Sequence, residues 1–153
     1  MQTTSPTIRV SVRDQRLDLV EAGAVVASYP VSTSRFGLGS EEGSRKTPLG
    51  RFRIGEKIGA GAPVGTIFRG RVPLAPNELP PTTEDHVLTR ILWLDGLEPQ
   101  NANTRARFIY IHGTPHEDRL GQPDSHGCIR MKTADLLALF DRVSTGAEVV
   151  ITA

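Results

Sequence analysis

The chain is short of the features that mark several large classes of protein. It has a single cysteine, Cys128, among 153 residues, which excludes an internal disulfide. No run of 18 apolar residues occurs, so no membrane helix is predicted. The formal net charge is +1 and both signs are mixed along the chain, so nothing indicates a nucleic-acid surface.

The first six residues, MQTTSP, also lack the basic start and apolar core of a signal peptide. We therefore expect a cytoplasmic protein, whereas an export signal removed from this end would place it in the periplasm. Apolar residues make up 38% of the chain and charged residues 23%, as in globular proteins. The length suits one core, so the sequence predicts a single domain over residues 1–153.

Alternating apolar and polar residues predict a mainly-β fold. The first three predicted strands are joined by short turns, which favours an antiparallel meander. The predicted strands are 7–13, 16–20, 24–32, one that begins at 52–54, 88–94, 107–112 and 147–152. One helix is predicted at 132–143 from its apolar stripe, with Thr133 as N-cap and Gly146 after its end. We expect a sandwich-like β domain with one helix packed on it.

Two segments show no periodic pattern of apolar residues. Residues 34–45 are rich in glycine, serine and charge, which predicts a loop. Glycines and prolines interrupt residues 55–86 throughout. We expect this longer segment to form a lid or a binding wall, anchored by its apolar residues Ile67, Phe68, Val72 and Leu74.

The only cysteine lies in the segment SHGCIRM at 125–131, just before the predicted helix. A lone cysteine often serves as a small buried hydrophobe, but His126 and Gly127 are not residues that a core strand favours. The N-terminal end of a helix and a nearby imidazole both favour the thiolate, which is the nucleophilic form. These residue types therefore indicate a cysteine nucleophile.

Two histidines can act as the base for this thiol. His112 ends a predicted strand, where a rigid element aims its side chain. His126 is two positions from Cys128, so in extended chain both side chains point to the same side. The backbone N–H groups of His126, Gly127 and Cys128 are also placed to form an oxyanion hole. The residue pattern leaves the choice of base open.

Three segments resemble the L,D-transpeptidase (YkuD) catalytic domain family. They are TPLGRF at 47–52, IHGTP at 111–115 and SHGCIRM at 125–131. They occur in the family's order, and the resemblance extends over essentially the whole chain. The last segment is highly specific, whereas the first would be weak alone. The resemblance implies a YkuD-like β-sandwich with one helix after the cysteine segment.

The resemblance also implies roles for individual residues. Cys128 would be the nucleophile and His112 its base, with the carbonyl of Gly113 orienting the imidazole in place of a triad carboxylate. The oxyanion hole would come from the N–H groups of His126, Gly127 and Cys128.

Ser125 and Arg130 would support the loop or bind the substrate, and Arg130 is the better candidate for an anion because the motif fixes it near the thiol. Two positions depart from the usual pattern: only 12 residues separate His112 from Ser125, and Arg130 stands where some members carry Asn. We expect both departures to reflect variation between subgroups of the family rather than loss of activity.

The implied activity is acyl transfer on a peptidoglycan tetrapeptide or muropeptide, cutting the bond between diaminopimelate and D-alanine through a cysteine acyl-enzyme. Water as acceptor gives an L,D-carboxypeptidase, which we favour, in cytoplasmic wall recycling. An amine acceptor in the periplasm gives 3→3 cross-links or D-amino-acid exchange. No cofactor, metal, membrane or nucleic-acid partner is expected.

Two other classes of function compete with this one. The first is a zinc site, for which the available side chains are His112, His116, Asp124, His126 and Cys128. The spacing of zinc motifs is absent, since glycine and proline interrupt the helix that two histidines four residues apart would need. The second is a non-catalytic wall-binding domain of the same fold, against which the intact set of Cys, His and Gly argues.

Some side chains outside the motifs also carry expectations. Trp93 lies mid-strand among aliphatic residues, which favours a place in the core over the wall of a substrate site. His86 is expected in a solvated loop. Arg35, Arg45 and Lys46 are expected on a solvated loop face rather than on a substrate carboxylate.

Overall fold

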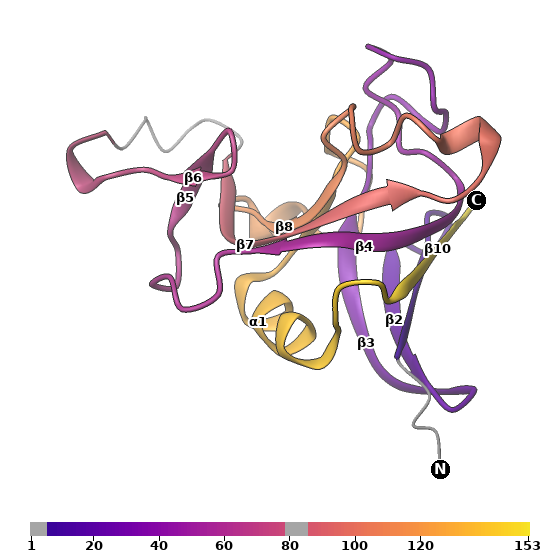
Figure 1. Ribbon diagram of the computed structural model, residues 1–153, viewed down its shortest axis with the longest axis horizontal. Helices are drawn as coiled ribbons and strands as arrows, with labels where there is room; N and C mark the ends of the chain where they lie inside the picture. The colour runs from indigo at the N-terminus through magenta and orange to yellow at the C-terminus, as the bar shows by residue number, and fades with distance from the viewer. Residues whose placement is uncertain (1–5, 79–85) are drawn as a thin grey trace.

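The computed structural model describes residues 6–78 and 86–153, and Figure 1 shows their arrangement. The described strands are β1 (Thr7–Ser11), β2 (Arg16–Glu21), β3 (Ala24–Ser32), β4 (Gly50–Ile58), β5 (Ile67–Arg69), β6 (Val72–Pro73), β7 (Val87–Gly96), β8 (Tyr110–Gly113), β9 (Ile129–Met131) and β10 (Glu148–Thr152). The helix is α1 (Thr133–Arg142), and the 3-10 helices are η1 (Pro76–Glu78), η2 (Pro99–Asn101) and η3 (Glu117–Arg119).

The strands make one sheet whose ends meet. Eight of them follow in the order β4-β10-β1-β2-β3-β9-β8-β7, and β4 also pairs with β7. The main core cluster receives buried side chains from all eight strands and from α1. The β5–β6 hairpin extends from β7 and protrudes from the body of the molecule (Figure 1). The prediction of a mainly-β fold with one helix after the cysteine segment is confirmed.

The meander formed by β1, β2 and β3 is antiparallel, as predicted, and β3 has the predicted bounds. The sequence does not predict β5, β6 and β9, because segments of two or three residues show no period. β8 begins at Tyr110 rather than at 107, because residues 102–108 form turns. Pairing with distant strands, rather than local pattern, fixes these short elements.

The helix start differs from the prediction. The N-cap position falls on Lys132, so Thr133 is the first helical residue and does not cap. The N–H of Thr133 donates to Glu117 Oε2 at 2.9 Å, so a carboxylate from η3 satisfies the helix end. Within the described ranges, no helix is long and apolar enough to cross a membrane.

The segment predicted as a lid is more regular than its sequence suggests. Its first residues continue β4, and β5 pairs with β7 through Ile67 and Leu88. Phe68 is buried, as an anchor should be, but Val72 is 62% exposed and anchors nothing. The part of the prediction that concerns residues 79–85 lies outside the described residues.

Candidate active site

The two motif segments that contain histidine and cysteine meet at β8 and β9. These neighbouring strands run parallel, with Ile111 opposite Ile129 and His112 opposite Arg130. Ile111 and Ile129 point into the main core, whereas Tyr110 belongs to a smaller cluster against which Cys128 packs. Because side chains alternate along a strand, His112 and Cys128 share the face opposite the core.

Cys128 lies just before β9, and its side chain is partly buried. The N–H of Tyr110 donates to Sγ at 3.3 Å, and the thiol donates to the carbonyl of Phe108 at the same distance. The thiol is therefore held by the backbone that leads into β8.

His112 is buried, with 3% of its surface exposed. Its Nδ1 lies 2.6 Å from the carbonyl oxygen of Gly113. A carbonyl only accepts, so Nδ1 carries the proton, and Nε2 of the neutral ring is the atom that can take one. Gly113 leaves no room for a side chain, because a Cβ there would stand 2.8 Å from the carbonyl oxygen of Leu88.

His126 is exposed and turned toward the loop that follows β3. Its ring stacks on Phe36 with centroids 5.7 Å apart, and its Nε2 lies 2.9 Å from Arg35 Nη2. Arginine only donates, so Nε2 of His126 accepts this bond, and its lone pair is occupied. His126 therefore uses Nε2 in its bond to Arg35, whereas His112 uses Nδ1 in its bond to Gly113.

The loop that carries the expected oxyanion hole is held from inside. Gly127 has φ +123°, a conformation that glycine adopts without strain. Its N–H already donates to Ser125 Oγ at 3.2 Å. Ser125 Oγ in turn donates to the carbonyl of Cys128 at 2.6 Å. The N–H of Gly127 is thus engaged within the loop, whereas the resemblance implies that all three N–H groups face an oxyanion.

Neither side chain expected to bind substrate reaches a surface. Ser125 is 1% exposed and braces the loop, which is the other role that the resemblance implies for it. Arg130 is 2% exposed, and its Nη1 lies 2.7 Å from Asp124 Oδ2. Burial raises the pKa of Asp124, but the bonds and charges of Arg130 and Arg119 outweigh it and hold that pKa below its usual range. Both residues therefore support the loop.

The TPLG segment supports the same loop from the other side. Thr47 is fully buried, and its hydroxyl donates to the carbonyl of Gly127 at 3.0 Å. It also accepts the N–H of Ser34 at 2.9 Å. One hydroxyl thus joins the loop after β3 to the cysteine loop, which accounts for a threonine at this point of the motif.

Arg107 is a site residue that sequence reasoning missed. Its guanidinium donates to the carbonyl of Lys46 at 2.7 Å and to that of Gly39 at 3.3 Å. Burial lowers the pKa of Arg107, while the charge of Cys128 acts in the opposite direction. Arg107 therefore braces the segment that follows β3, and its charge interacts with that of Cys128. Its position at the start of a predicted strand gave no indication of this role.

Trp93 and His86 are placed differently from the prediction. Trp93 is only half-buried and packs with the smaller cluster on the face of Cys128, not in the main core. Its ring lies edge-on to Tyr110 at 5.7 Å and 6.0 Å from Phe108. His86, which was expected in a solvated loop, is buried, with 8% of its surface exposed. Trp93 and Cys128 thus both pack against the smaller cluster that contains Tyr110.

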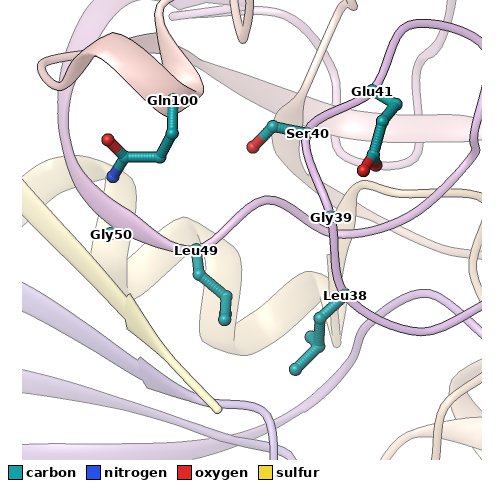
Figure 2. Close-up of a pocket in the computed structure, with 7 residues that line it drawn as sticks. All are labelled: Leu38, Gly39, Ser40, Glu41, Leu49, Gly50 and Gln100. Carbon is teal, nitrogen blue, oxygen red and sulfur yellow. The ribbon is translucent and has the colours of Figure 1, made fainter.

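Two hollows flank the loop after β3. One of about 150 Å³ has His126, Arg45 and Arg107 in its wall, next to the cysteine loop. The other, of about 510 Å³, has an apolar side made by Leu38 and Leu49, with Gln100 and Ser40 across from them (Figure 2). The larger hollow does not include the thiol or His112 in its lining.

The side chains considered as zinc ligands do not gather into a metal site in the described part of the chain. Within residues 6–78 and 86–153 no group of three His, Cys, Asp or Glu side chains comes close enough to hold a metal ion. Asp124, one of the zinc ligands considered from sequence, is engaged by two arginines instead.

Comparison with known proteins identifies the class. The L,D-transpeptidase catalytic domain (YkuD) matches residues 5–151. The chain therefore belongs to this family of cysteine acyltransferases. A protein of Bacillus subtilis named as a candidate L,D-transpeptidase, YqjB, is 41% identical over 49 residues, which are 32% of this chain and 28% of that protein.

Solved structures agree on the fold. An L,D-transpeptidase from Mycobacterium smegmatis has a TM-score of 0.64 at 16% identity, over 97% of this chain and 59% of that one. One from Xylanimonas cellulosilytica has a TM-score of 0.64 at 19% identity, over 99% and 62%. L,D-transpeptidase 3 from Mycobacterium tuberculosis, solved with a faropenem-derived adduct, scores 0.63 at 16% identity, over 97% and 60%. The chain thus spans less than two thirds of these relatives.

Proposed function

We propose that this protein cleaves the bond between diaminopimelate and the terminal D-alanine of peptidoglycan stem tetrapeptides through an acyl-enzyme on Cys128. In the first step His112 Nε2 takes the thiol proton, and sulfur attacks the carbonyl carbon of diaminopimelate. The C–N bond then breaks, and D-alanine leaves with the proton from His112. An acceptor attacks the thioester in the second step and releases the thiol.

One observation carries this proposal. The bond from His112 Nδ1 to the Gly113 carbonyl leaves Nε2 as the proton acceptor, on the strand face where Cys128 lies. The carbonyl of Gly113 does the orienting that a carboxylate does in other triads. The N–H groups of His126 and Cys128 are the proposed oxyanion donors, with Gly127 giving the loop its turn.

For the acceptor we propose water, which makes the protein an L,D-carboxypeptidase of cytoplasmic wall recycling. The acceptor experiment decides between this choice and its alternative. Transfer to an amine, which gives 3→3 cross-links or D-amino-acid exchange, is the alternative function.

The test is mass spectrometry of a disaccharide-tetrapeptide after incubation with the protein, with and without excess D-methionine. Loss of D-alanine to give tripeptide, unaffected by the amine, is the expected result. A D-methionine adduct or a dimer would mean that the acyl group is transferred to an amine rather than to water. Cys128→Ala is run alongside, and a product that still forms in this variant would overturn the proposed nucleophile.

A second readout does not need the wall peptide. A relative was solved with a faropenem-derived adduct, so we propose that faropenem acylates Cys128 here as well. Intact-mass measurement should show one adduct on the native protein and none on Cys128→Ala. An unmodified native protein would argue against an acylating site of this kind.

A further inference from the structure

The β5–β6 hairpin carries an arginine in an unusual backbone position. Phe68 pairs with Pro73 and Arg69 with Val72, so Gly70 and Arg71 form the two-residue turn. Both have positive φ, +56° and +67°. Such turns favour glycine, asparagine or aspartate, and a long side chain at positive φ is uncommon. A side chain persists in such a conformation only where the surrounding contacts hold it.

The guanidinium of Arg71 is held by three aromatic side chains. Its Nη1 donates to the hydroxyl of Tyr110 at 3.0 Å. Its central carbon lies 4.9 Å from the ring centre of Trp93 and equally far from that of Phe108. Two rings and one hydroxyl thus fix the direction of a planar cation.

A second arginine, Arg105, also lies beside Trp93, and it differs from Arg71 in its ion pairs. Arg105 lies 4.3 Å from the Trp93 ring centre and is neutralised by Glu56 at 2.8 Å and Asp95 at 3.3 Å. Within the described part of the chain, Arg71 has no carboxylate within ion-pair distance. Arg105 is thus engaged by two carboxylates, whereas the contacts described for Arg71 are with aromatic side chains.

Arg71 is also tied to the thiol through two shared residues. Phe108 gives its carbonyl to Cys128 Sγ and its ring to Arg71. Tyr110 gives its N–H to Sγ and its hydroxyl to Arg71. The two residues whose backbone contacts the sulfur are therefore two of the three whose side chains hold this cation.

From this geometry we infer that Arg71 is a specificity-determining residue, which binds a free carboxylate of the acyl donor while Cys128 attacks the neighbouring carbonyl. This deepens the proposed function and rests on it for the identity of the donor. A stem tetrapeptide has two candidate carboxylates near the cut bond. One is the C-terminal carboxylate of the leaving D-alanine, and the other is on the side chain of diaminopimelate.

The first experiment needs no wall substrate. Alkylation of Cys128 is compared for 3-maleimidopropionate, which carries a carboxylate, and for neutral N-ethylmaleimide. The ratio of the two rate constants cancels any change in the thiol itself. For Arg71→Gln we expect this ratio to fall about ten-fold from loss of a charge-assisted contact. Arg71→Lys, which keeps the charge and loses the fork, should fall between.

Arg69→Gln is the matched control, because Arg69 is an exposed cation of the same hairpin with the same charge. Its ratio should equal that of the native protein, and thermal melting establishes that all variants are folded. An unchanged ratio in Arg71→Gln, or an equal fall in Arg69→Gln, overturns the inference.

The second experiment identifies the carboxylate. Hydrolysis of the tetrapeptide is compared with that of its C-terminal amide and of the analogue amidated on the diaminopimelate side chain. Arg71→Gln should lose about ten- to hundred-fold in kcat/KM on the free peptide and far less on the analogue that lacks the recognised carboxylate. Equal losses on all three peptides would overturn the inference. A ratio that falls with maleimides while no peptide is cut keeps the anion site and rejects the proposed donor.

Discussion

The two faces of the β8–β9 pair carry different kinds of side chain on the same backbone. On one face Ile111, Ile129 and Met131 are fully buried in the main core. On the other face lie His112 and Cys128, and Cys128 packs against the smaller cluster that contains Tyr110. Alternation along a strand lets consecutive residues do different work, so one short segment both anchors the fold and presents the chemistry.

This difference shows how the position of the thiol depends on the core. Ile129, which follows Cys128, is fully buried, and its strand is paired on both sides, with β3 and β8. A side chain on such a strand is aimed more closely than one on a free loop. Moving the thiol would require moving part of the core.

Substitutions at the neighbouring residues 128 and 129 should have the largest effects, one on activity and the other on stability. Cys128→Ala should lower D-alanine release by more than about a thousand-fold, with a free energy of unfolding within about 1 kcal/mol of native. Ile129→Ala should lower the free energy of unfolding by about 2–5 kcal/mol, from the cavity left in the core. Urea unfolding and the release assay measure both. A Cys128→Ala protein that unfolds as easily as Ile129→Ala would break the comparison.

The two histidines give the next largest contrast. His112→Gln should lower kcat by about a hundred- to ten-thousand-fold through loss of the base. His126→Gln should lose about ten-fold at most, since its imidazole faces Arg35 and Phe36. Steady-state kinetics with folded protein decides between them. Equal losses in both variants would contradict the assignment of the base.

A smaller effect is expected where the cysteine loop meets the TPLG segment. Thr47→Val should cost about 1–3 kcal/mol, because the N–H of Ser34 loses its buried acceptor and the carbonyl of Gly127 its donor. Thr66→Val is the control, since its hydroxyl makes one exposed bond to Pro63. Thermal melting measures both. A Thr47→Val protein as stable as the control would mean that this link is not needed.

The smallest expected effect concerns acid. The depressed pKa of Asp124 adds stability at pH values above the unfolded pKa, about 3.9, which is lost as pH falls through the folded pKa. Asp124→Asn should lower the free energy of unfolding at pH 7 by about 1–2 kcal/mol, because Arg130 loses this partner. Its stability should also fall less between about pH 5 and 3. Asp141→Asn, at an exposed carboxylate, should match the native slope.

The sequence by itself determined the chemistry and the main strands. The alternation at 24–32 and the helical stripe after Cys128 are local patterns, so each could be predicted without its partners. The thiol, the imidazole and the glycine beside them were identified as residue types at fixed spacing. Those are properties of short segments.

Tertiary structure alone decided which groups meet. The bond between His126 and Arg35 and the brace from Arg107 to Lys46 join segments far apart in the chain. The same holds for Glu117 at the helix start and for Arg71 above the aromatic rings. No local period encodes such contacts, because they arise only when the sheet closes and brings the loops to one end of it.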